Sequence, residues 1–94
     1  MGTLREEIIR LLAEHREGLT AKEICQLLGI EPEREKEVYS HIEAIARIVR
    51  RKGMRLLMLP PRCRQCGFEF EKPKASRCPK CKSERIEPAR FKID

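Results

Sequence analysis

Apolar residues in the first half of the chain recur at the spacing of amphipathic helices, in three separate stretches. The pattern predicts a first helix that runs to about Arg16, a second between Thr20 and Gly29, and a third from Pro32 to about Arg51. Each helix would bury one apolar stripe and expose charged residues on its other side. The stripes consist of Leu4, Ile8, Leu11 and Leu12, of Ile24, Leu27 and Leu28, and of Val38, Ile42, Ile45 and Val49.

The predicted helix boundaries carry signals of their own. Thr3 with Glu6 and Thr20 with Glu23 have the spacing of capping boxes, in which each side chain bonds the backbone N–H of the other residue. Pro32 suits the first turn of the third helix, because an N–H would have no helical partner there. Glycines stand where a left-handed residue commonly ends a helix, at Gly18, Gly29 and Gly53.

Two capped helices, with a three- or four-residue turn before a longer third helix, are typical of a tri-helical helix-turn-helix. We therefore expect residues 1–53 to form a tri-helical helix-turn-helix core. A three-helix bundle with no nucleic-acid role is the alternative, because any small helical domain needs such apolar stripes.

After the third helix the hydrophobic pattern changes to that of strands. Residues 55–59 are an apolar run stopped by two prolines, and residues 90–93 alternate polar and apolar side chains. We expect these segments to pair antiparallel as the wing strands of an α+β winged helix, within a second part that covers residues 54–94. The alternative is a flexibly tethered module with a frayed tail, which would leave Phe91 and Ile93 without partners.

Residues 62–88 would then be an insertion in the wing, and they contain four cysteines as two Cys-x-x-Cys pairs. Each pair can present two thiolates from one tight turn, and two such turns complete the S₄ shell of a structural zinc site. One structural Zn²⁺ is therefore predicted on Cys63, Cys66, Cys78 and Cys81. Short strands are expected beside the turns, over residues 67–71 and 84–87.

Other roles for these cysteines fit less well. Disulfides would need an oxidising compartment, and no secretory signal precedes the first helix. Haem attachment would need a histidine after a pair, where Gly67 and Lys82 stand. Iron uses similar S₄ sites, so the ligands alone leave zinc and iron both open, with the short gap favouring zinc. Cys25, beside Ile24 in the second helix, is interpreted as a small core residue.

Charge is unevenly distributed along the chain of 94 residues. Residues 1–53 have a net charge of zero and residues 54–94 carry the whole formal charge of +6. Zinc with four thiolates contributes about −2, which leaves the second part basic. This half, with the basic end of the third helix, is therefore where attraction to a polyanion is expected.

A winged helix places its third helix in the major groove of DNA, so exposed polar residues there are candidate contacts. Basic residues of the cysteine module are candidate contacts to phosphate. The acidic start of the third helix, with four glutamates between residues 31 and 37, weakens the case for its first turn. The candidates are Lys36, Ser40, Arg47, Arg50, Arg51, Arg64, Lys74, Arg77, Lys80 and Lys82.

The order of these motifs resembles a family of small archaeal proteins described as predicted transcriptional regulators, in which a helix-turn-helix is fused to a rubredoxin-like zinc ribbon. The resemblance implies a winged helix, a zinc ribbon and a DNA-binding role. Lys82 stands where many such ribbons have glycine. The resemblance rests on Leu28-Gly29-Ile30, Glu37-Val38-Tyr39, His41-Ile42, Cys63-Arg64-Gln65-Cys66-Gly67-Phe68, Arg77-Cys78-Pro79-Lys80-Cys81, Ile86-Glu87-Pro88 and Arg90-Phe91.

The sequence therefore predicts a cytoplasmic DNA-binding transcriptional regulator whose partner is double-stranded DNA, with no membrane partner. The alternative is a protein–protein interaction module of a transcription or other nucleic-acid complex, with the ribbon docked on a protein partner. RNA or ribosome association is disfavoured by the few aromatic residues. A homodimer is left open. No enzyme is expected, because four thiolates close the zinc shell and no catalytic constellation is evident.

Overall fold

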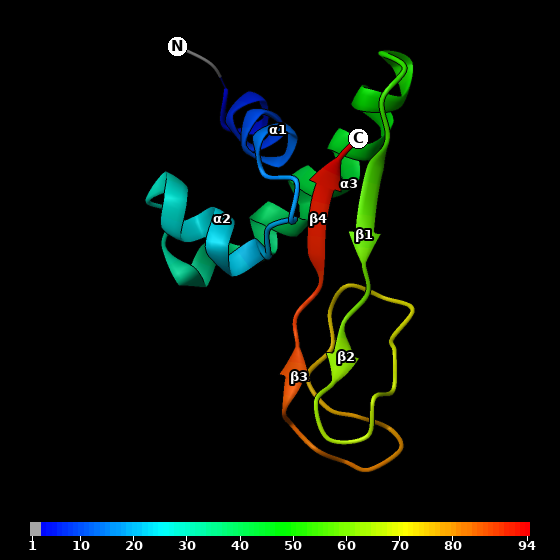
Figure 1. Cartoon of the computed structure of the whole chain (residues 1–94). Coiled ribbons are helices and arrows are strands. Elements are labelled where there is room, and N and C mark those ends of the chain that lie inside the picture. Colours follow the sequence, from blue (N-terminus) through cyan, green and yellow to red (C-terminus); the bar gives the residue numbers. More distant parts are fainter. Residues whose placement is uncertain (1–2) are drawn as a thin grey trace. The chain divides into compact units, whose positions relative to one another are not determined.

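The computed structural model of the protein describes residues 3–94. It contains helices and short strands in the order of an α+β protein (Figure 1). By its internal contacts the chain divides into a helical unit, which holds the chain up to Leu57 together with Phe91–Asp94, and a ribbon unit, Met58–Arg90. The elements are α1 (Leu4–Glu14), α2 (Ala21–Leu28), the 3₁₀ turn η1 (Pro32–Arg34), α3 (Glu35–Arg51), β1 (Leu56–Leu59), β2 (Arg62–Cys63), β3 (Ile86–Glu87) and β4 (Arg90–Ile93).

The apolar stripes of the three helices form the core of the helical unit. Helix α3 packs against both α1 and α2. Ile8 of α1, Ile24 of α2 and Ile45 of α3 have no exposed surface, so each buries its whole apolar side chain in the core. Burial of one such side chain is worth about 1.5–3 kcal/mol. The same stripes that predicted the helices therefore hold them together.

The two predicted capping boxes are formed to different extents. At α2 the N–H of Glu23 donates to Thr20 Oγ1 at 3.1 Å, and the N–H of Thr20 donates to Glu23 Oε1 at 3.0 Å. The box is complete there, and Thr20 is buried. At α1 the N–H of Glu6 donates to Thr3 Oγ1 at 3.2 Å, which is one half of a box. Side chains thus satisfy N–H groups that a helix start leaves unpaired.

Helix α1 ends two residues before its predicted end at Arg16, because His15 has left the helical conformation with ψ of 93°. Helix α2 ends at Gly29, whose φ of +69° lets the N–H of Ile30 reach the C=O of Cys25 at 2.8 Å. This is the hydrogen bond of a Schellman motif. Pro32 then begins a 3₁₀ turn rather than the α-helix itself, which starts at Glu35.

The C-terminal strand belongs to the helical unit. Strand β4 pairs with β1 in a two-stranded sheet, and beyond the sheet Arg55 and Asp94 exchange backbone N–H···O bonds of 3.1 and 2.9 Å. Phe91 is 3% exposed and its ring meets that of Tyr39 edge to face, with centroids 6.2 Å apart. The last residues are therefore packed rather than frayed.

The ribbon unit contains a second two-stranded sheet, in which β2 pairs antiparallel with β3. Arg62 lies opposite Glu87, and Cys63 lies opposite Ile86. Large apolar side chains are scarce in this unit. Its buried residues are Pro61, Cys63, Cys78 and Ala89.

The predicted strand over residues 67–71 was wrong. A single bridge forms there, between Glu69 and Arg62, because the chain turns at Gly67 and bends again at residues 71–73. The predicted strand over residues 84–87 is shortened to its last two residues. Its first half is lost because the N–H of Arg85 donates to Ser83 Oγ at 3.1 Å instead of to a neighbouring strand.

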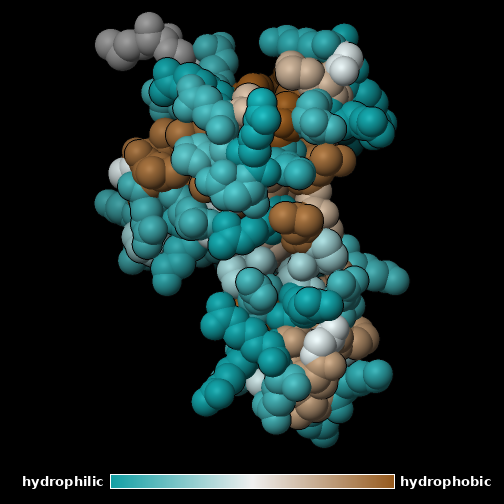
Figure 2. Space-filling model, viewed as in Figure 1, coloured by the Kyte–Doolittle hydropathy of each residue, from teal (hydrophilic) through white to brown (hydrophobic). Residues whose placement is uncertain are grey.

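The visible surface is largely hydrophilic (Figure 2). Among residues 3–94, two large apolar side chains are exposed, Leu27 of α2 at 54% and Leu59 of β1 at 46%. Within residues 3–94, no helix has the length and apolar character that a membrane crossing requires.

Candidate metal centre and nucleic-acid interface

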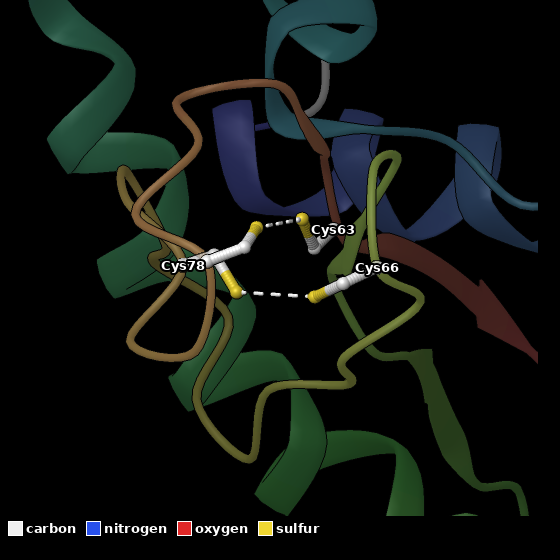
Figure 3. A group of neighbouring side chains, drawn as sticks. Cys63, Cys66 and Cys78 are labelled. Carbon is white, nitrogen blue, oxygen red and sulfur yellow. Dashed lines mark hydrogen bonds between the residues drawn. The ribbon is translucent and has the colours of Figure 1, made fainter.

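Four cysteine sulfurs meet in the ribbon unit (Figure 3). Their Sγ atoms all lie within 4.8 Å of one another. The Sγ atoms of Cys63 and Cys81 are 3.5 Å apart, and so are those of Cys66 and Cys78. Both close pairs join one Cys-x-x-Cys turn to the other. The two turns, which we call knuckles, therefore face each other across a shared cluster.

The two knuckles have the same backbone hydrogen bonds. In the first, the N–H of Gly67 donates to the C=O of Cys63 at 2.9 Å, and the N–H of Cys63 donates to the C=O of Phe68 at 2.8 Å. The second knuckle repeats both bonds at 2.9 Å, from Lys82 to Cys78 and from Cys78 to Ser83. Equal backbone geometry presents the two cysteine pairs in equivalent positions around the cluster.

The residue after each second cysteine adopts a left-handed conformation. Gly67 has φ of +80° and Lys82 has φ of +60°. Lys82 is the single non-glycine residue with positive φ among residues 3–94. A side chain in this conformation costs on the order of 1 kcal/mol. The second knuckle therefore folds like the first in spite of a lysine where glycine would be unstrained.

Backbone amides favour negative charge on the first cysteine of each knuckle. The N–H groups of Cys66 and Gln65 lower the pKa of Cys63 to about 6, although desolvation of the sulfur opposes them. At Cys78 desolvation raises the pKa, but the N–H groups of Cys81 and Lys80 help to bring it below its ordinary value. These two sulfurs are the buried members of the cluster. Amide donors thus favour the thiolate form of both sulfurs.

The second cysteine of each knuckle resists ionisation when no metal is bound. The N–H of Ser83 lowers the pKa of Cys81, but desolvation and hydrogen bonds to the other three sulfurs raise it to about 12. The pKa of Cys66 is also raised, in spite of the N–H of Phe68, by desolvation and by its bonds to Cys78 and Cys63. Four negative charges at this spacing need a cation among them.

Zn²⁺ fits this donor set. Four thiolates around zinc at a Zn–S distance of about 2.3 Å form a tetrahedron whose sulfurs lie about 3.8 Å apart. The observed separations, 3.5 Å for two pairs and at most 4.8 Å for all, are close to that figure. The protein would supply all four ligands, so the ion would have a closed shell and a structural role. The predicted ligands Cys63, Cys66, Cys78 and Cys81 are the ones that come together.

The predicted DNA contacts in the first half of the chain lie on one helix. Lys36, Ser40 and Arg47 are exposed on α3, while the buried stripe of that helix faces the core. Arg50 and Arg51 are exposed in its last turn. The hydroxyl of Ser40 donates to the C=O of Lys36 at 3.3 Å, a weak bond that leaves it available to another partner.

The start of α3 differs from its end in charge. Four glutamates lie between residues 31 and 37, and Arg34 pairs with Glu37 at 2.8 Å. That ion pair lowers the pKa of Glu37 through its hydrogen bond to Arg34, so the carboxylate stays charged. An anion would therefore meet repulsion at the first turn of α3 and attraction at the last.

The remaining predicted contacts lie in the ribbon unit, and all of them are exposed. The structure thus divides the predicted DNA contacts into one set on α3 and another on the ribbon. Arg85 is a further exposed arginine that the sequence pattern did not single out, because only the pairing of β2 with β3 shows which residue it opposes. The ribbon set consists of Arg64, Lys74, Arg77, Lys80 and Lys82.

Cys25 is separate from the cluster. It is 2% exposed in the core of the helical unit, as predicted. Burial, followed by the charge of Glu35, raises the pKa of its thiol. A buried, protonated thiol is a poor nucleophile and a poor ligand. Cys25 is therefore a core residue.

Both parts of the chain match models of known families. Residues 3–57 match the model described as PF0610-like, N-terminal, and residues 60–94 match the PF0610 rubredoxin-like zinc beta-ribbon domain. None of the curated proteins matches the chain. The solution NMR structure of protein PF0610 from Pyrococcus furiosus is similar, with 41% sequence identity, a TM-score of 0.81, and coverage of 100% of this chain and 92% of that one. With its N-terminal domain and its four-cysteine zinc ribbon, the chain belongs to the PF0610-like family.

Proposed function

We propose that the protein is a DNA-binding transcriptional regulator, built as a winged helix-turn-helix with a structural zinc ribbon inserted in the wing. The observation that carries the proposal is the exposed outer face of α3, which follows α2 after a short turn. In a helix-turn-helix the second of the two helices enters the major groove. Strands β1 and β4 would be the wing.

Base contacts would come from the outer face of α3, where Lys36, Ser40 and Arg47 are exposed. Arginine and lysine donate hydrogen bonds to guanine, and the serine hydroxyl can hydrogen-bond to several bases. The glutamates at the start of the helix keep phosphate away from its first turn, so contact is expected to concentrate toward Arg47, Arg50 and Arg51. The helix would thus approach DNA through its basic end.

Phosphate contacts would come mainly from the ribbon. Residues 58–90 contain nine lysines and arginines against four glutamates. The zinc-bound thiolates remove about two charges from this excess, and the ribbon remains positive. Such a surface attracts the DNA backbone without regard to sequence, which positions the protein for readout by α3.

Zinc would have no catalytic part in this function. A shell of four thiolates leaves no position for water or substrate. Its role is to fold the ribbon, because metal-binding energy is also folding energy in a small module. We therefore infer that the protein is not an enzyme.

The proposal is tested with zinc-loaded protein titrated onto duplex DNA of random and genomic sequence at about 50 mM and 200 mM salt. Binding that weakens steeply with salt and selects preferred sequences supports it. The variant Arg47→Ala should lose sequence preference, whereas Arg10→Ala, an exposed arginine of α1, should keep it. No binding at the lower salt by folded, zinc-bound protein would refute the proposal.

A protein–protein interaction module is the second candidate. The acidic start of α3 and the exposed Leu27 at the end of α2 favour it, because together they offer a partner both charge and apolar surface. In that case the ribbon would dock on a component of a transcription or other nucleic-acid complex. Failure to bind DNA in the titration above, with the fold intact, would favour this candidate.

A further inference from the structure

The antiparallel pairing of β2 with β3 brings two arginines opposite each other. Its register places Arg62 opposite Glu87 and Cys63 opposite Ile86. Continued by one residue, the same register places Arg64 opposite Arg85. The backbone N–H of Arg64 donates to the C=O of Arg85 at 2.9 Å, so one of the two hydrogen bonds of such a pair is formed just beyond the strands, while the N–H of Arg85 donates to Ser83 Oγ.

Side chains directly opposite in an antiparallel pair have Cβ atoms about 4.5–5.5 Å apart and lie on one face. Like charges in this arrangement repel each other and destabilise the pair. Both Arg64 and Arg85 are exposed. No carboxylate of residues 3–94 forms an ion pair with either of them.

The neighbouring cross-strand pair shows the contrast. Two residues before Arg64, in β2, Arg62 faces Glu87 and is bridged to Glu69, whose carboxylate lies 3.9 Å from the guanidinium. The charge of Arg62 is thus balanced by the protein, whereas the charges of Arg64 and Arg85 are left for an external anion.

We propose that Arg64 and Arg85 together bind one phosphate group, and that in the cell this phosphate belongs to the backbone of nucleic acid. Two guanidinium groups at this spacing can each donate to oxygens of the same phosphate, and the anion removes their mutual repulsion. The biological ligand rests on the DNA-binding function proposed above. The phosphate site itself rests on the register between β2 and β3 alone.

The metal cluster would hold this site in place. Arg64 lies between Cys63 and Cys66 in the first knuckle, and Arg85 follows the second knuckle, where its N–H is fixed to Ser83 Oγ. Each arginine is therefore positioned by a different cysteine pair. Zinc, by joining the pairs, would keep the two guanidinium groups on one face.

The first experiment measures the salt dependence of binding to a short random-sequence duplex by the full zinc-loaded chain. Each phosphate contact contributes about 0.9 to the slope of log K against log salt. The variant Arg64→Gln/Arg85→Gln should reduce that slope by about 0.9, because the two arginines contact one phosphate. Arg5→Gln/Arg10→Gln, which removes the same charge from exposed positions of α1, should reduce it much less.

The second experiment needs no DNA. Inorganic phosphate is titrated into the zinc-loaded protein, and the backbone amide resonances of Arg64 and Arg85 are followed by NMR. Saturable shifts at both, absent from the double glutamine variant, are expected. Zinc content and amide dispersion of the variant confirm that its ribbon is folded.

The outcomes separate the inference from the proposed function. If the wild type binds DNA but the double variant keeps the full salt slope, the pair is not a phosphate site and the regulator proposal stands. If the wild type fails to bind DNA, the phosphate titration decides: saturable shifts support a site for free phosphate, and no shifts overturn the inference. Loss of zinc affinity in the double variant without loss of phosphate binding would overturn the inference. The two arginines would then stabilise the negative charge of the zinc-bound thiolates instead of binding phosphate.

Discussion

Leu19 and Phe91 exchange both of their backbone hydrogen bonds, with N–O distances of 2.9 and 2.8 Å. The bridge joins the loop between α1 and α2 to the C-terminal strand, across 72 positions of sequence. Both side chains are buried, and the ring of Phe91 also meets that of Tyr39. The last strand is thereby fixed to the helices by backbone and side chain together.

Replacement of Phe91 by alanine should destabilise the helical unit by about 3–5 kcal/mol, because it removes a ring that is only 3% exposed and leaves a cavity in its place. Phe91→Leu, which keeps most of the volume, should cost less than about 1.5 kcal/mol. Denaturant unfolding followed by helical circular dichroism measures both. An equal, small loss in the two variants would mean that the ring is not part of the core.

The conformation of Lys82 predicts that glycine is the better residue at this position. Lys82→Gly should relieve the strain of a positive φ, partly offset by the greater freedom of glycine in the unfolded chain. A net gain of about 0.5–1 kcal/mol corresponds to about two- to five-fold tighter zinc binding. Competition with a chromophoric chelator measures it.

Two variants control for charge and space at the knuckles. Lys82→Ala removes the same charge but keeps the strain, so it should show no gain. Gly67→Ala introduces the strain into the first knuckle, where no atom lies within 4 Å of the added Cβ, and should weaken zinc binding through the backbone alone. A gain for Lys82→Ala equal to that for glycine would assign the effect to charge instead.

The cysteine pKa values predict that zinc binding releases protons. Cys66 and Cys81 have raised pKa values in the metal-free cluster, so both hold protons at neutral pH and must lose them to become ligands. Cys63, with a pKa of about 6, is already a thiolate at neutral pH, so it contributes to the pH dependence of zinc affinity only at lower pH. Zinc affinity should therefore rise with pH, with at least the two protons of Cys66 and Cys81 released per ion at neutral pH and more below pH about 6.

Calorimetry of zinc binding in two buffers of different ionisation enthalpy counts these protons. Cys25→Ala should leave the count unchanged, because that thiol lies in the helical core away from the cluster. A pH-independent zinc affinity between neutral and alkaline pH would show that all four sulfurs are ionised before the metal arrives.

Local signals in the sequence were sufficient to predict the helices and the metal ligands. The stripe of α3, the box at Thr20 and the Cys-x-x-Cys spacing each depend on residues a few positions apart, and each recurs in the structure. The failures concern the short strands of the ribbon unit and not the pairing of β1 with β4. The sequence of residues 67–71 has the local pattern of a strand. The knuckle before this segment and the bends after it leave room for only one β-bridge, between Glu69 and Arg62.

Register was the other property that sequence did not show. Nothing local relates Arg64 to Arg85, which become opposite residues only through the pairing of β2 with β3. The opposed signs of the two ends of α3 were readable from sequence. Which of its residues would contact DNA in the proposed function depends on the surface of the DNA, and folding alone does not decide it.

The two units should respond differently to removal of the metal. The helical unit has a core of fully buried isoleucine, leucine and valine, whereas the buried residues of the ribbon unit are Pro61, Cys63, Cys78 and Ala89. So small an apolar core cannot offset the chain entropy of residues 58–90, and the cysteine cluster has to supply the difference. Zinc binding by such modules is worth about 10–16 kcal/mol at neutral pH.

A strong chelator should therefore collapse the amide dispersion of residues 58–90 while the helical circular dichroism is retained. Cys78→Ser in the presence of zinc should reproduce this state, because it removes one of the two buried ligands. Cys25→Ser is the matched control, since it changes a cysteine outside the cluster. The amide resonances of the ribbon should stay well dispersed in this variant. Cooperative loss of the helices on chelation would show instead that the metal supports both units, and the ribbon would then have to be regarded as part of the helical fold.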